Sequence, residues 1–415
     1  MNKLKKRKLV KSIIKFIKDD EIIVIHGSRQ VGKTSLMHYI IENYIKKESV
    51  SENIFYFDLE DFRLLDLCNS SPDDVINYLK AKGANFNKRV YLFVDEIQYL
   101  NNPSSFLKLF YDRYKGTVKL VVSGSSSLLI KKKFKDALVG RILDFELFTL
   151  NFEEFLEFKG LKYNLKISLP DAIHEELKKL YKEYVIFGGY PAIVMENGIE
   201  KKEIKLKQII NTYIKKDIRD IADIRDINKF NDLIRIVASQ SGSLLNILEL
   251  STTLGMAKKT VKEYLFLLEN TYIIRRIRPF HKNIRSELTK MPKIFLEDTG
   301  MLNILTNKTF SMNIDGKLFE NSIYSELRKN IPIEYIYFWR TNIKQEIDFI
   351  IEYVKNQIYA IEVKNMFFNK HTTHLKYFKK IYPGVELYTC CLEKKEKSNI
   401  IKVIYPWELL KIFKL

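Results

Sequence analysis

One short stretch near the start of the chain constrains its fold more than any other feature. Residues 26–35 read HGSRQVGKTS and contain the pattern G-x-x-x-x-G-K-[ST]. An apolar run, residues 21–25, precedes this stretch, and an amphipathic segment, residues 35–45, follows it. Because strand, glycine loop and helix in this order form a phosphate-binding loop, the sequence predicts an α/β domain of the P-loop NTPase class with a parallel sheet. An ordinary glycine turn before a helix is the alternative.

The residue types in this loop suit the phosphates of a nucleotide and its magnesium ion. Gly27 and Gly32 let the backbone curl so that N–H groups point at an anion, and the following helix terminus adds positive charge. We expect Lys33 to reach the β- and γ-phosphates as a catalytic group, and the Thr34 hydroxyl to bind Mg²⁺. The predicted ATP-binding residues are Gly27, Ser28, Arg29, Gln30, Val31, Gly32, Lys33, Thr34 and Ser35.

A second motif further along the chain supplies the carboxylates that ATP hydrolysis needs. Residues 89–94 read RVYLFV and run directly into Asp95 and Glu96. A buried strand that ends in two carboxylates is typical of a Walker B motif. We expect Asp95 to hold Mg²⁺ beside Thr34, and Glu96 to act as general base toward the attacking water. The alternative is a strand that ends in a solvated loop.

Two further positions are candidates for stabilising the γ-phosphate. A strand predicted over residues 118–122 runs into a serine-rich segment, where Ser123, with Ser125 second, could bond the phosphate or the water. Arg141 precedes a predicted strand over residues 142–147 and could stabilise charge in cis or toward a neighbouring subunit. An ordinary serine turn and a structural ion pair are the respective alternatives.

The composition indicates a folded, cytoplasmic protein that attracts polyanions. No apolar stretch approaches the roughly 18 residues that a membrane span requires, and the basic start lacks the apolar core of a signal peptide. Cys68, Cys390 and Cys391 form neither a disulfide framework nor a metal-binding spacing, which fits a reducing cytoplasm. The formal net charge of +19 favours nucleic acid as a partner, although lysine-rich chains are often basic throughout.

The middle of the chain is predicted to hold a helical lid followed by a winged helix-turn-helix. Residues 244–256 and 257–269 read as two helices joined by a turn at Gly255, and residues 273–277 read as a wing strand. In a DNA-binding version the start of the second helix would face the major groove. A protein-interaction module with solvated lysines is the alternative. The candidate DNA contacts are Lys258, Lys259, Thr260 and Lys262, with Arg275, Arg276 and Arg278 on the wing.

The last part of the chain has the layout of a metal-dependent nuclease. Glu362 and Lys364 are two apart on a predicted strand and therefore share a face, and Asp348 lies on the preceding strand. With Glu320 these carboxylates would bind Mg²⁺, while Lys364 would lower the pKa of the attacking water or hold the phosphate. A fold retained only for binding is the alternative. The predicted elements are a helix at 317–330, strands at 335–339, 347–351 and 358–364, a helix at 371–380 and a strand at 385–391.

Together these motifs resemble a widespread prokaryotic family of AAA+-like P-loop ATPases with a C-terminal domain of unknown function of the DUF4143 type. The family signature G-x-R-Q-V-G-K-T, hhhhDE, S-G-S-S-S and L-x-G-R matches the segments above. It continues through FEEF at 152–155, FGGYP at 187–191, EDTG at 297–300 and EIDF at 346–349. The resemblance covers nearly the whole chain. It implies ATP binding and a winged helix followed by a PD-(D/E)xK nuclease-type, restriction-endonuclease-like fold.

These observations predict three domains and one leading function. The domains are an ATPase domain at 1–150, a lid and winged helix at 151–285, and a nuclease-like domain at 286–415. The leading hypothesis is an ATPase that engages nucleic acid, DNA rather than RNA, with the ATP state controlling the nuclease-like domain. The alternative is a slow nucleotide switch, scaffold or regulator whose C-terminal domains only bind a partner protein or DNA. A homo-oligomer or a protein partner fits either hypothesis, and no membrane is expected.

Overall fold

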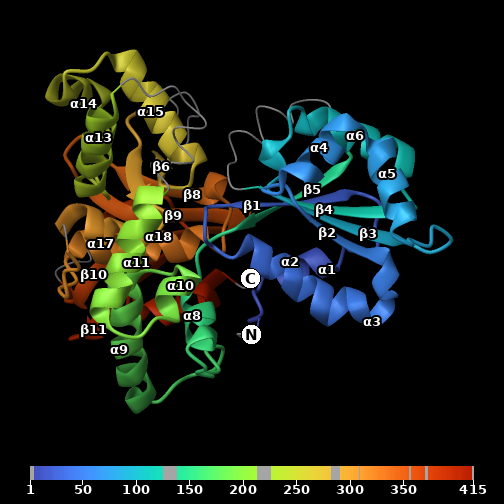
Figure 1. Cartoon of the computed structure of the whole chain (residues 1–415). Helices are drawn as coiled ribbons and strands as arrows, with labels where there is room; N and C mark the ends of the chain where they lie inside the picture. The colour runs from blue at the N-terminus through green and yellow to red at the C-terminus, as the bar shows by residue number, and fades with distance from the viewer. Residues whose placement is uncertain are drawn as a thin grey trace. The chain divides into compact units, whose positions relative to one another are not determined.

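The chain forms two compact units, both shown in the computed structural model in Figure 1. Unit 1 comprises Met1–Phe148, Thr212–Asp223 and Asn270–Tyr272, and unit 2 comprises the rest of the chain. The three-domain division stays a prediction. The structure describes residues 4–124, 138–212, 226–281, 290–307, 309–354, 357–369 and 373–413.

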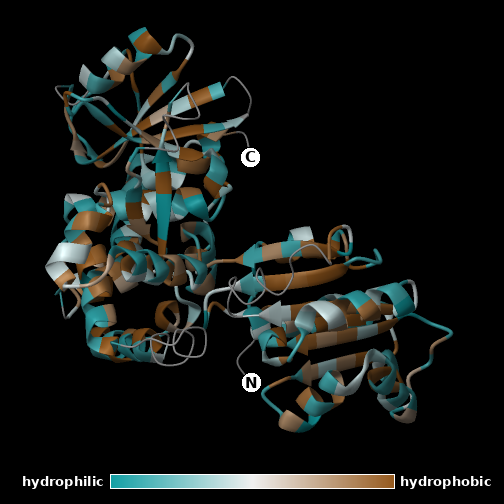
Figure 2. Cartoon of the chain, turned by 90° about the horizontal axis from the view of Figure 1, so that it is seen from above, coloured by the Kyte–Doolittle hydropathy of each residue, from teal (hydrophilic) through white to brown (hydrophobic). Residues whose placement is uncertain are grey.

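Unit 1 is built on a five-stranded sheet whose order is β2-β3-β4-β1-β5. Every neighbouring pair is parallel, and β1, β3 and β4 are buried along their whole length. Parallel strands are covered by helices on both faces, so they read as continuous apolar runs, which appear brown in Figure 2. The strands are β1 (Ile22–Gly27), β2 (Ile54–Asp58), β3 (Val90–Asp95), β4 (Val118–Gly124) and β5 (Ile142–Leu147).

Helices cover both faces of this sheet (Figure 1). Side chains of α4, α5 and α6, among them Val75, Leu79 and Leu107, join those of the strands in one buried cluster. Helices α1, α2 and α3 lie against the other face. These helices are α1 (Val10–Ile14), α2 (Lys33–Ile40), α3 (Lys46–Glu48), α4 (Phe62–Ser70), α5 (Pro72–Ala81) and α6 (Pro103–Tyr114).

Unit 2 is built on a seven-stranded mixed sheet whose order is β12-β11-β10-β9-β8-β6-β7. The pairs β6/β7, β8/β9 and β9/β10 are antiparallel, and the other neighbours are parallel. Because β6 and β7 pair, the sheet crosses the domain boundary predicted between residues 285 and 286. The strands are β6 (Ile274–Pro279), β7 (Lys293–Leu296), β8 (Ile336–Arg340), β9 (Glu346–Val354), β10 (Gln357–Phe367), β11 (Glu386–Lys394) and β12 (Lys402–Ile404).

The helices of unit 2 include a central one, α18, that is buried on nearly all sides. Phe319, Ile323 and Leu327 of α18 are fully buried, and the helix packs against β7 and β10. Each helix and strand predicted over residues 317–391 has a counterpart. The helices are α8 (Phe152–Phe158), α9 (Asp171–Phe187), α10 (Pro191–Val194), α11 (Ile199–Thr212), α13 (Ile227–Ser239), α14 (Ile247–Leu254), α15 (Lys258–Asn270), α17 (Thr299–Asn307), α18 (Gly316–Arg328) and α19 (Thr373–Ile381).

Two glycine-containing motifs of the family signature interlock within unit 2. The buried Asp298 carboxylate accepts the N–H of Gly189 at 2.8 Å and that of Gly300 at 3.0 Å. A Cβ atom on Gly188 would lie 2.1 Å from the Asp298 carboxylate, so a side chain there would collide with it. These motif residues therefore stabilise the fold by close backbone packing.

The predicted fold class is confirmed. The protein is α/β, with a parallel sheet typical of a P-loop NTPase, a helical middle region and a second, mixed sheet.

Candidate functional site

The predicted phosphate-binding loop joins β1 to α2. Gly27 is the last residue of β1, and Lys33 is the first residue of α2. Gly32 caps the helix in the left-handed conformation at φ 95°, with no side chain to occupy the first N–H groups of α2. A Cβ atom on Gly27 would lie 2.1 Å from the carbonyl oxygen of Leu147, so this position also requires glycine. The loop therefore has the shape and the free helix terminus that an anion needs.

The Lys33 side chain folds back over this loop. Its Nζ donates to the carbonyl oxygen of Ser28 at 2.9 Å and to that of Gly27 at 3.1 Å, and the side chain is buried. Both acceptors in these two bonds are neutral carbonyl groups. A phosphate oxygen could replace either carbonyl oxygen as the acceptor of the ammonium group.

The Asp95 carboxylate is the centre of the candidate magnesium site. Its Oδ2 accepts from the Thr34 hydroxyl at 2.6 Å and from the Tyr56 hydroxyl at 2.6 Å. Its Oδ1 accepts from Ser123 and, at 3.1 Å, from the N–H of Glu96. Thr34 and Asp95, both predicted as magnesium ligands, therefore lie in direct contact. A hydroxyl and a carboxylate are hard oxygen donors, so these residues fit Mg²⁺.

The strand order brings Ser123 to the same place. Strand β4 lies between β1 and β3, and Ser123 stands near its carboxyl end. Its hydroxyl donates to Asp95 and accepts the N–H of Glu96 at 3.3 Å. The predicted sensor residue thus touches the Walker B motif, while Ser125 lies outside the described residues.

Glu96 follows Asp95 in a conformation that is uncommon for a residue with a side chain. Its φ is 57°, in the left-handed region, and its carboxylate accepts a hydrogen bond from the Gln98 amide. Strain of this kind concentrates at functional sites because the surrounding structure must hold it in place. The role of Glu96 as general base stays a prediction.

Arg141 lies at the amino-terminal ends of the strands, whereas the phosphate-binding loop lies at their carboxyl-terminal ends. Its carbonyl accepts from the N–H of Ile22, at the start of β1, whereas the loop begins at the far end of that strand. The six residues of β5 separate these two ends by about 20 Å along the strand. The guanidinium donates to Asp112 at 2.8 Å and holds the pKa of that carboxyl below its usual value. A catalytic role in cis does not fit this position, and a role toward a neighbouring subunit stays a prediction.

Two residues that sequence reasoning missed support the loop. Arg7 donates from its buried guanidinium to the carbonyl oxygens of Val31 and Phe148, each at 2.8 Å. Burial, together with the hydrogen bond to Asp95, raises the pKa of Tyr56 well above its usual value, so Tyr56 stays a neutral donor. Neither residue belongs to a recognisable motif, and no sequence signal distinguishes them.

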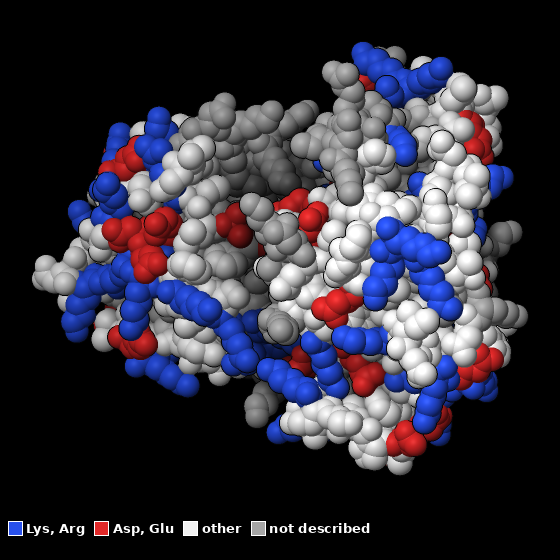
Figure 3. All heavy atoms as spheres, turned by 180° about the vertical axis from the view of Figure 1, so that it is seen from behind, with Lys and Arg blue, Asp and Glu red and all other residues white. Residues whose placement is uncertain are grey.

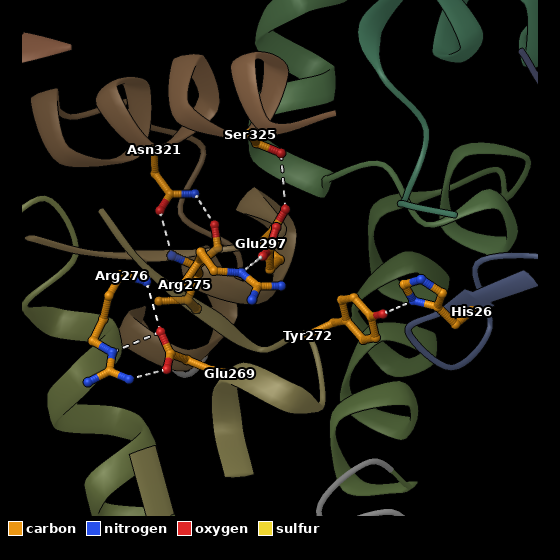
Figure 4. Close-up of polar contacts among 9 residues, drawn as sticks. His26, Glu269, Tyr272, Arg275, Arg276, Glu297, Asn321 and Ser325 are labelled. Atoms are coloured by element: carbon orange, nitrogen blue, oxygen red, sulfur yellow. Dashed lines mark hydrogen bonds and ion pairs between the residues drawn. The ribbon is translucent and has the colours of Figure 1, made fainter. Parts of the chain in front are cut away.

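His26, directly before the loop, is a third such residue. Its Nε2 lies 2.9 Å from the Asp144 carboxylate, and its Nδ1 contacts the hydroxyl of Tyr272, which belongs to unit 1 (Figure 4). Tyr272 has a φ of 61°, again in the left-handed region. Both ring nitrogens of His26 are therefore engaged, which fixes the ring beside Gly27.

The predicted helix-turn-helix corresponds to α14 and α15. Gly255 ends α14 in the left-handed conformation at φ 56°. Helix α15 buries an apolar face that includes Val261 and Leu265. The lysines near its start lie on the opposite side, and Lys258, Lys259 and Lys262 are exposed while Thr260 is half-buried. The residues predicted to meet DNA on this helix are thus accessible.

The wing arginines are placed differently. Arg276 donates to Glu269 at 2.8 Å, and Arg275 donates to Glu297 at 3.1 Å, as Figure 4 shows. These two guanidinium groups are therefore used for ion pairs within unit 2, while the Arg278 side chain is exposed. Basic side chains also spread among acidic ones over the face shown in Figure 3, so net charge alone does not locate a binding surface there.

The site residues predicted in the C-terminal part lie close together. A further lysine, Lys293, which was not predicted, lies among them. We call the group the carboxylate–lysine cluster. Lys364 Nζ lies 2.6 Å from Glu362 Oε1, and Asp348 Oδ2 accepts the N–H of Val363 at 2.8 Å. The cluster consists of Lys293 on β7, Glu320 on α18, Glu346 and Asp348 on β9, and Glu362 and Lys364 on β10.

Lys293 lies among three of these carboxylates. Its Nζ is 2.6 Å from Glu346 Oε1, 3.0 Å from Glu320 Oε1 and 3.8 Å from Asp348 Oδ1, and its side chain is 1% exposed. Burial opposes its charge, but Glu320, Asp348 and Glu346 outweigh burial and raise the pKa of Lys293. Lys293 is therefore an ammonium ion inside the cluster.

The carboxyl groups of Glu320 and Glu362 titrate far above their usual range. Burial, reinforced by repulsion from Asp348 and opposed by Lys293, raises the pKa of Glu320 to about 8. Burial and Asp348, opposed by Lys364, raise the pKa of Glu362 to about 8 as well. Two of the four acids therefore hold a proton readily near neutral pH.

The predicted magnesium ligands Glu320, Asp348 and Glu362 do not fit a metal ion in this arrangement. Among the described residues, no group of three or more His, Cys, Asp or Glu side chains is arranged to hold one. A divalent ion at these carboxylates would lie next to the Lys293 ammonium. One oxygen, Oε2 of Glu362, is buried with no hydrogen-bond partner in the described part of the chain.

Three domain families match successive parts of the chain. An AAA domain matches residues 19–156, a domain of unknown function (DUF8612) matches residues 178–311, and a domain of unknown function (DUF4143) matches residues 315–410. The predicted resemblance is confirmed, because the chain combines an AAA-type P-loop ATPase domain with a DUF4143 domain. The AAA match supports ATP binding and hydrolysis in general.

Similar proteins occur in bacteria and archaea. An uncharacterized protein of Haemophilus influenzae is 26% identical over 405 residues, which cover 95% of this chain and 96% of that protein. An uncharacterized protein of Methanocaldococcus jannaschii is 28% identical over 340 residues, covering 80% of this chain and 72% of that one. The Walker-type ATPase PABY2304 of Pyrococcus abyssi is a similar solved structure, with 12% identity, a TM-score of 0.46, and coverage of 73% of this chain and 95% of that chain.

No helix within the described residues is both long and apolar enough to span a bilayer.

Proposed function

We propose that this protein is a Mg²⁺-dependent ATPase whose nucleotide state controls how unit 2 engages nucleic acid. The ATPase proposal is supported above all by the hydrogen-bonded series Thr34–Asp95–Ser123. Three neighbouring strands of the parallel sheet bring together the loop, the Walker B carboxylate and the predicted sensor serine. This series joins the residues that would hold the metal ion to the residue that would contact the γ-phosphate.

The residues of unit 1 have separate tasks in hydrolysis. Lys33 would exchange its carbonyl partners for the β- and γ-phosphates, and Thr34 and Asp95 are the residues that would hold Mg²⁺. Mg²⁺, when bound, neutralises charge on the phosphate oxygens as the terminal phosphoryl group is transferred. Glu96 accepts the proton of the attacking water, and Ser123 orients that water or the γ-phosphate.

The nucleic-acid part of the proposal is carried by α15. Exposed Lys258, Lys259 and Lys262 stand in the first turns of a helix whose opposite face is buried, the placement from which a recognition helix contacts phosphates and bases. The antiparallel pair β6/β7 follows this helix in the sequence, as a wing does, and β6 also pairs with β8 in the seven-stranded sheet. The formal net charge of +19 adds sequence-independent attraction to DNA.

The C-terminal part is proposed to bind rather than to cleave. The order helix, three strands, helix, strand and the presence of Asp348, Glu362 and Lys364 favour a nuclease-like fold. The Lys293 ammonium among the carboxylates opposes metal-dependent cleavage. The binding alternative from the sequence is therefore the one that the geometry supports.

The ATPase proposal is tested by steady-state ATP hydrolysis in Mg²⁺, with and without duplex DNA. We expect Lys33→Ala to lose about 100-fold or more of the turnover, because its charge is needed in the transition state. Lys108→Ala, which removes an exposed lysine of α6, is the matched control and should keep wild-type turnover. Normal hydrolysis by Lys33→Ala would exclude this site as the ATPase centre.

A further inference from the structure

We propose that the ammonium group of Lys293 is the resident cation of the carboxylate–lysine cluster and stands where a divalent metal ion would otherwise bind. Its removal should convert the cluster into a metal site. This inference concerns unit 2 alone and does not depend on the ATPase proposal.

The fold fixes Lys293 in this position. Strand β7 pairs with β6 in antiparallel register, with Lys293 opposite Ile277. At the other end of β7, the Asn321 side chain of α18 bonds both backbone groups of Leu296, at 2.9 and 3.0 Å (Figure 4). Because Glu320 precedes Asn321 on α18, this docking places Lys293 and Glu320 against each other.

The charges of the cluster are close to balanced without a metal ion. Lys293 faces Glu320, Glu346 and Asp348, and Glu346 is also bonded by Arg340 at 3.0 Å. The remaining carboxylate, Glu362, is paired with Lys364. Four carboxyl groups therefore meet three cations around the buried Lys293 side chain. An added divalent ion would lie next to an ammonium ion at low dielectric, where repulsion between like charges is strong.

Loss of the ammonium would leave the oxygens that a hard cation prefers. Without Lys293, Oε1 of Glu320 and Oδ1 of Asp348 lose a positive partner, and Oε2 of Glu362 already has no hydrogen-bond partner in the described residues. Carboxyl oxygens from α18, β9 and β10 would then surround the place that the Lys293 ammonium had occupied. Mn²⁺ and Mg²⁺ bind such sets of oxygen ligands.

The first experiment is a titration of the nucleotide-free, full-length protein with Mn²⁺. Calorimetry and electron paramagnetic resonance measure how many Mn²⁺ ions bind. We expect the wild type and Asp348→Asn to bind the same number of Mn²⁺ ions, because Asp348 holds none. We expect Lys293→Met, which keeps the length of the side chain and removes its charge, to gain one site. The double variant Lys293→Met/Asp348→Asn should lose that site again. A Mn²⁺ ion bound by the wild type and lost in Asp348→Asn would overturn the proposal.

Thermal unfolding provides a second readout with a matched control. With a chelator present, Lys293→Met should unfold several degrees below the wild type, and Mn²⁺ should restore part of the difference. Lys293→Arg keeps a cation in place and should show no response to Mn²⁺, like the wild type. A folded Lys293→Met that gains no Mn²⁺ site would also overturn the proposal. If this variant does not fold, the comparison of wild type with Asp348→Asn still decides the resident-cation claim.

Discussion

Asp95 is the last residue of the buried strand β3 in unit 1, and Asp348 lies within β9 in unit 2. Both are carboxylates on strands, but the charges around them differ. The hydrogen-bond partners of Asp95 are hydroxyl groups and a backbone N–H, all of them neutral. Asp348 has the Lys293 ammonium 3.8 Å from its Oδ1. Neutral donors orient a carboxylate and leave its charge for a metal ion, whereas a buried lysine neutralises that charge. The partners of a carboxylate therefore decide whether it can serve as a metal ligand.

The largest effect expected from this comparison is on ATP turnover. Asp95→Asn keeps the size of the side chain but removes the charge that would hold Mg²⁺, and we expect turnover to fall about 100-fold or more. The same change in the other unit, Asp348→Asn, should leave turnover near the wild-type value. ATP hydrolysis measured over a range of Mg²⁺ concentrations checks both. Equal losses in the two variants would break the contrast between the sites.

The next effect is on stability. Lys293→Met leaves buried carboxylates without their cation, and we expect the free energy of unfolding to fall by about 3–5 kcal/mol. Lys364→Met is the comparison, because the Lys364 side chain is 37% exposed and its partner Glu362, which is 6% exposed, can take a proton when the lysine is removed. Its loss should be about 1 kcal/mol or less. Urea denaturation followed by circular dichroism measures both values, and a larger loss for Lys364→Met would contradict the assignment of Lys293 as the central cation.

A smaller effect is expected on the pH dependence of stability. The pKa of Glu320 and of Glu362 rises from 4.5 to about 8 in the folded chain, so the folded state holds more protons than the unfolded state between these values. The contribution of these groups to stability is therefore present below pH 4.5 and is lost as the pH rises through 8. Glu320→Gln should reduce this slope. Urea denaturation between pH 5 and 8 tests it, and an unchanged slope would show that Glu320 is ionised throughout.

The smallest effect is on nucleic-acid affinity. Replacing Lys258, Lys259 and Lys262 by alanine should weaken the binding of duplex DNA. The slope of log K against the logarithm of the salt concentration should become shallower by up to about 0.9 for each phosphate contact that is lost. The control replaces the exposed α19 lysines Lys376, Lys379 and Lys380, which removes the same charge elsewhere in unit 2. Fluorescence anisotropy at several salt concentrations distinguishes the two. Equal losses would mean that net charge, rather than α15, provides the affinity.

The sequence alone was sufficient to locate the candidate phosphate-binding loop because the parts of that loop are contiguous. Gly27, Gly32 and Lys33 are neighbours in one loop, and the Walker B carboxylate ends an apolar strand that the residue pattern reveals. Ser123 could be predicted because the carboxyl ends of parallel strands share one edge of a sheet. Arg141 precedes its strand, and in a parallel sheet this places it at the amino end, opposite the loop, so the parallel order decides against a catalytic role in cis.

The tertiary structure alone decided which charges meet. Arg7 and Tyr56 reach the candidate nucleotide site from outside any motif, and Lys293 reaches the carboxylates from β7, a strand that is not among the elements predicted for the nuclease-like domain. Strand periodicity predicted that Glu362 and Lys364 share a face, and the order of predicted elements placed Asp348 on the preceding strand and Glu320 on a helix. Their charge balance was not predicted, because it depends on a side chain that strand pairing and the docking of β7 on α18 bring into the cluster. Local patterns determine which groups a segment presents, but packing between distant segments determines the electrostatic environment in which those groups act.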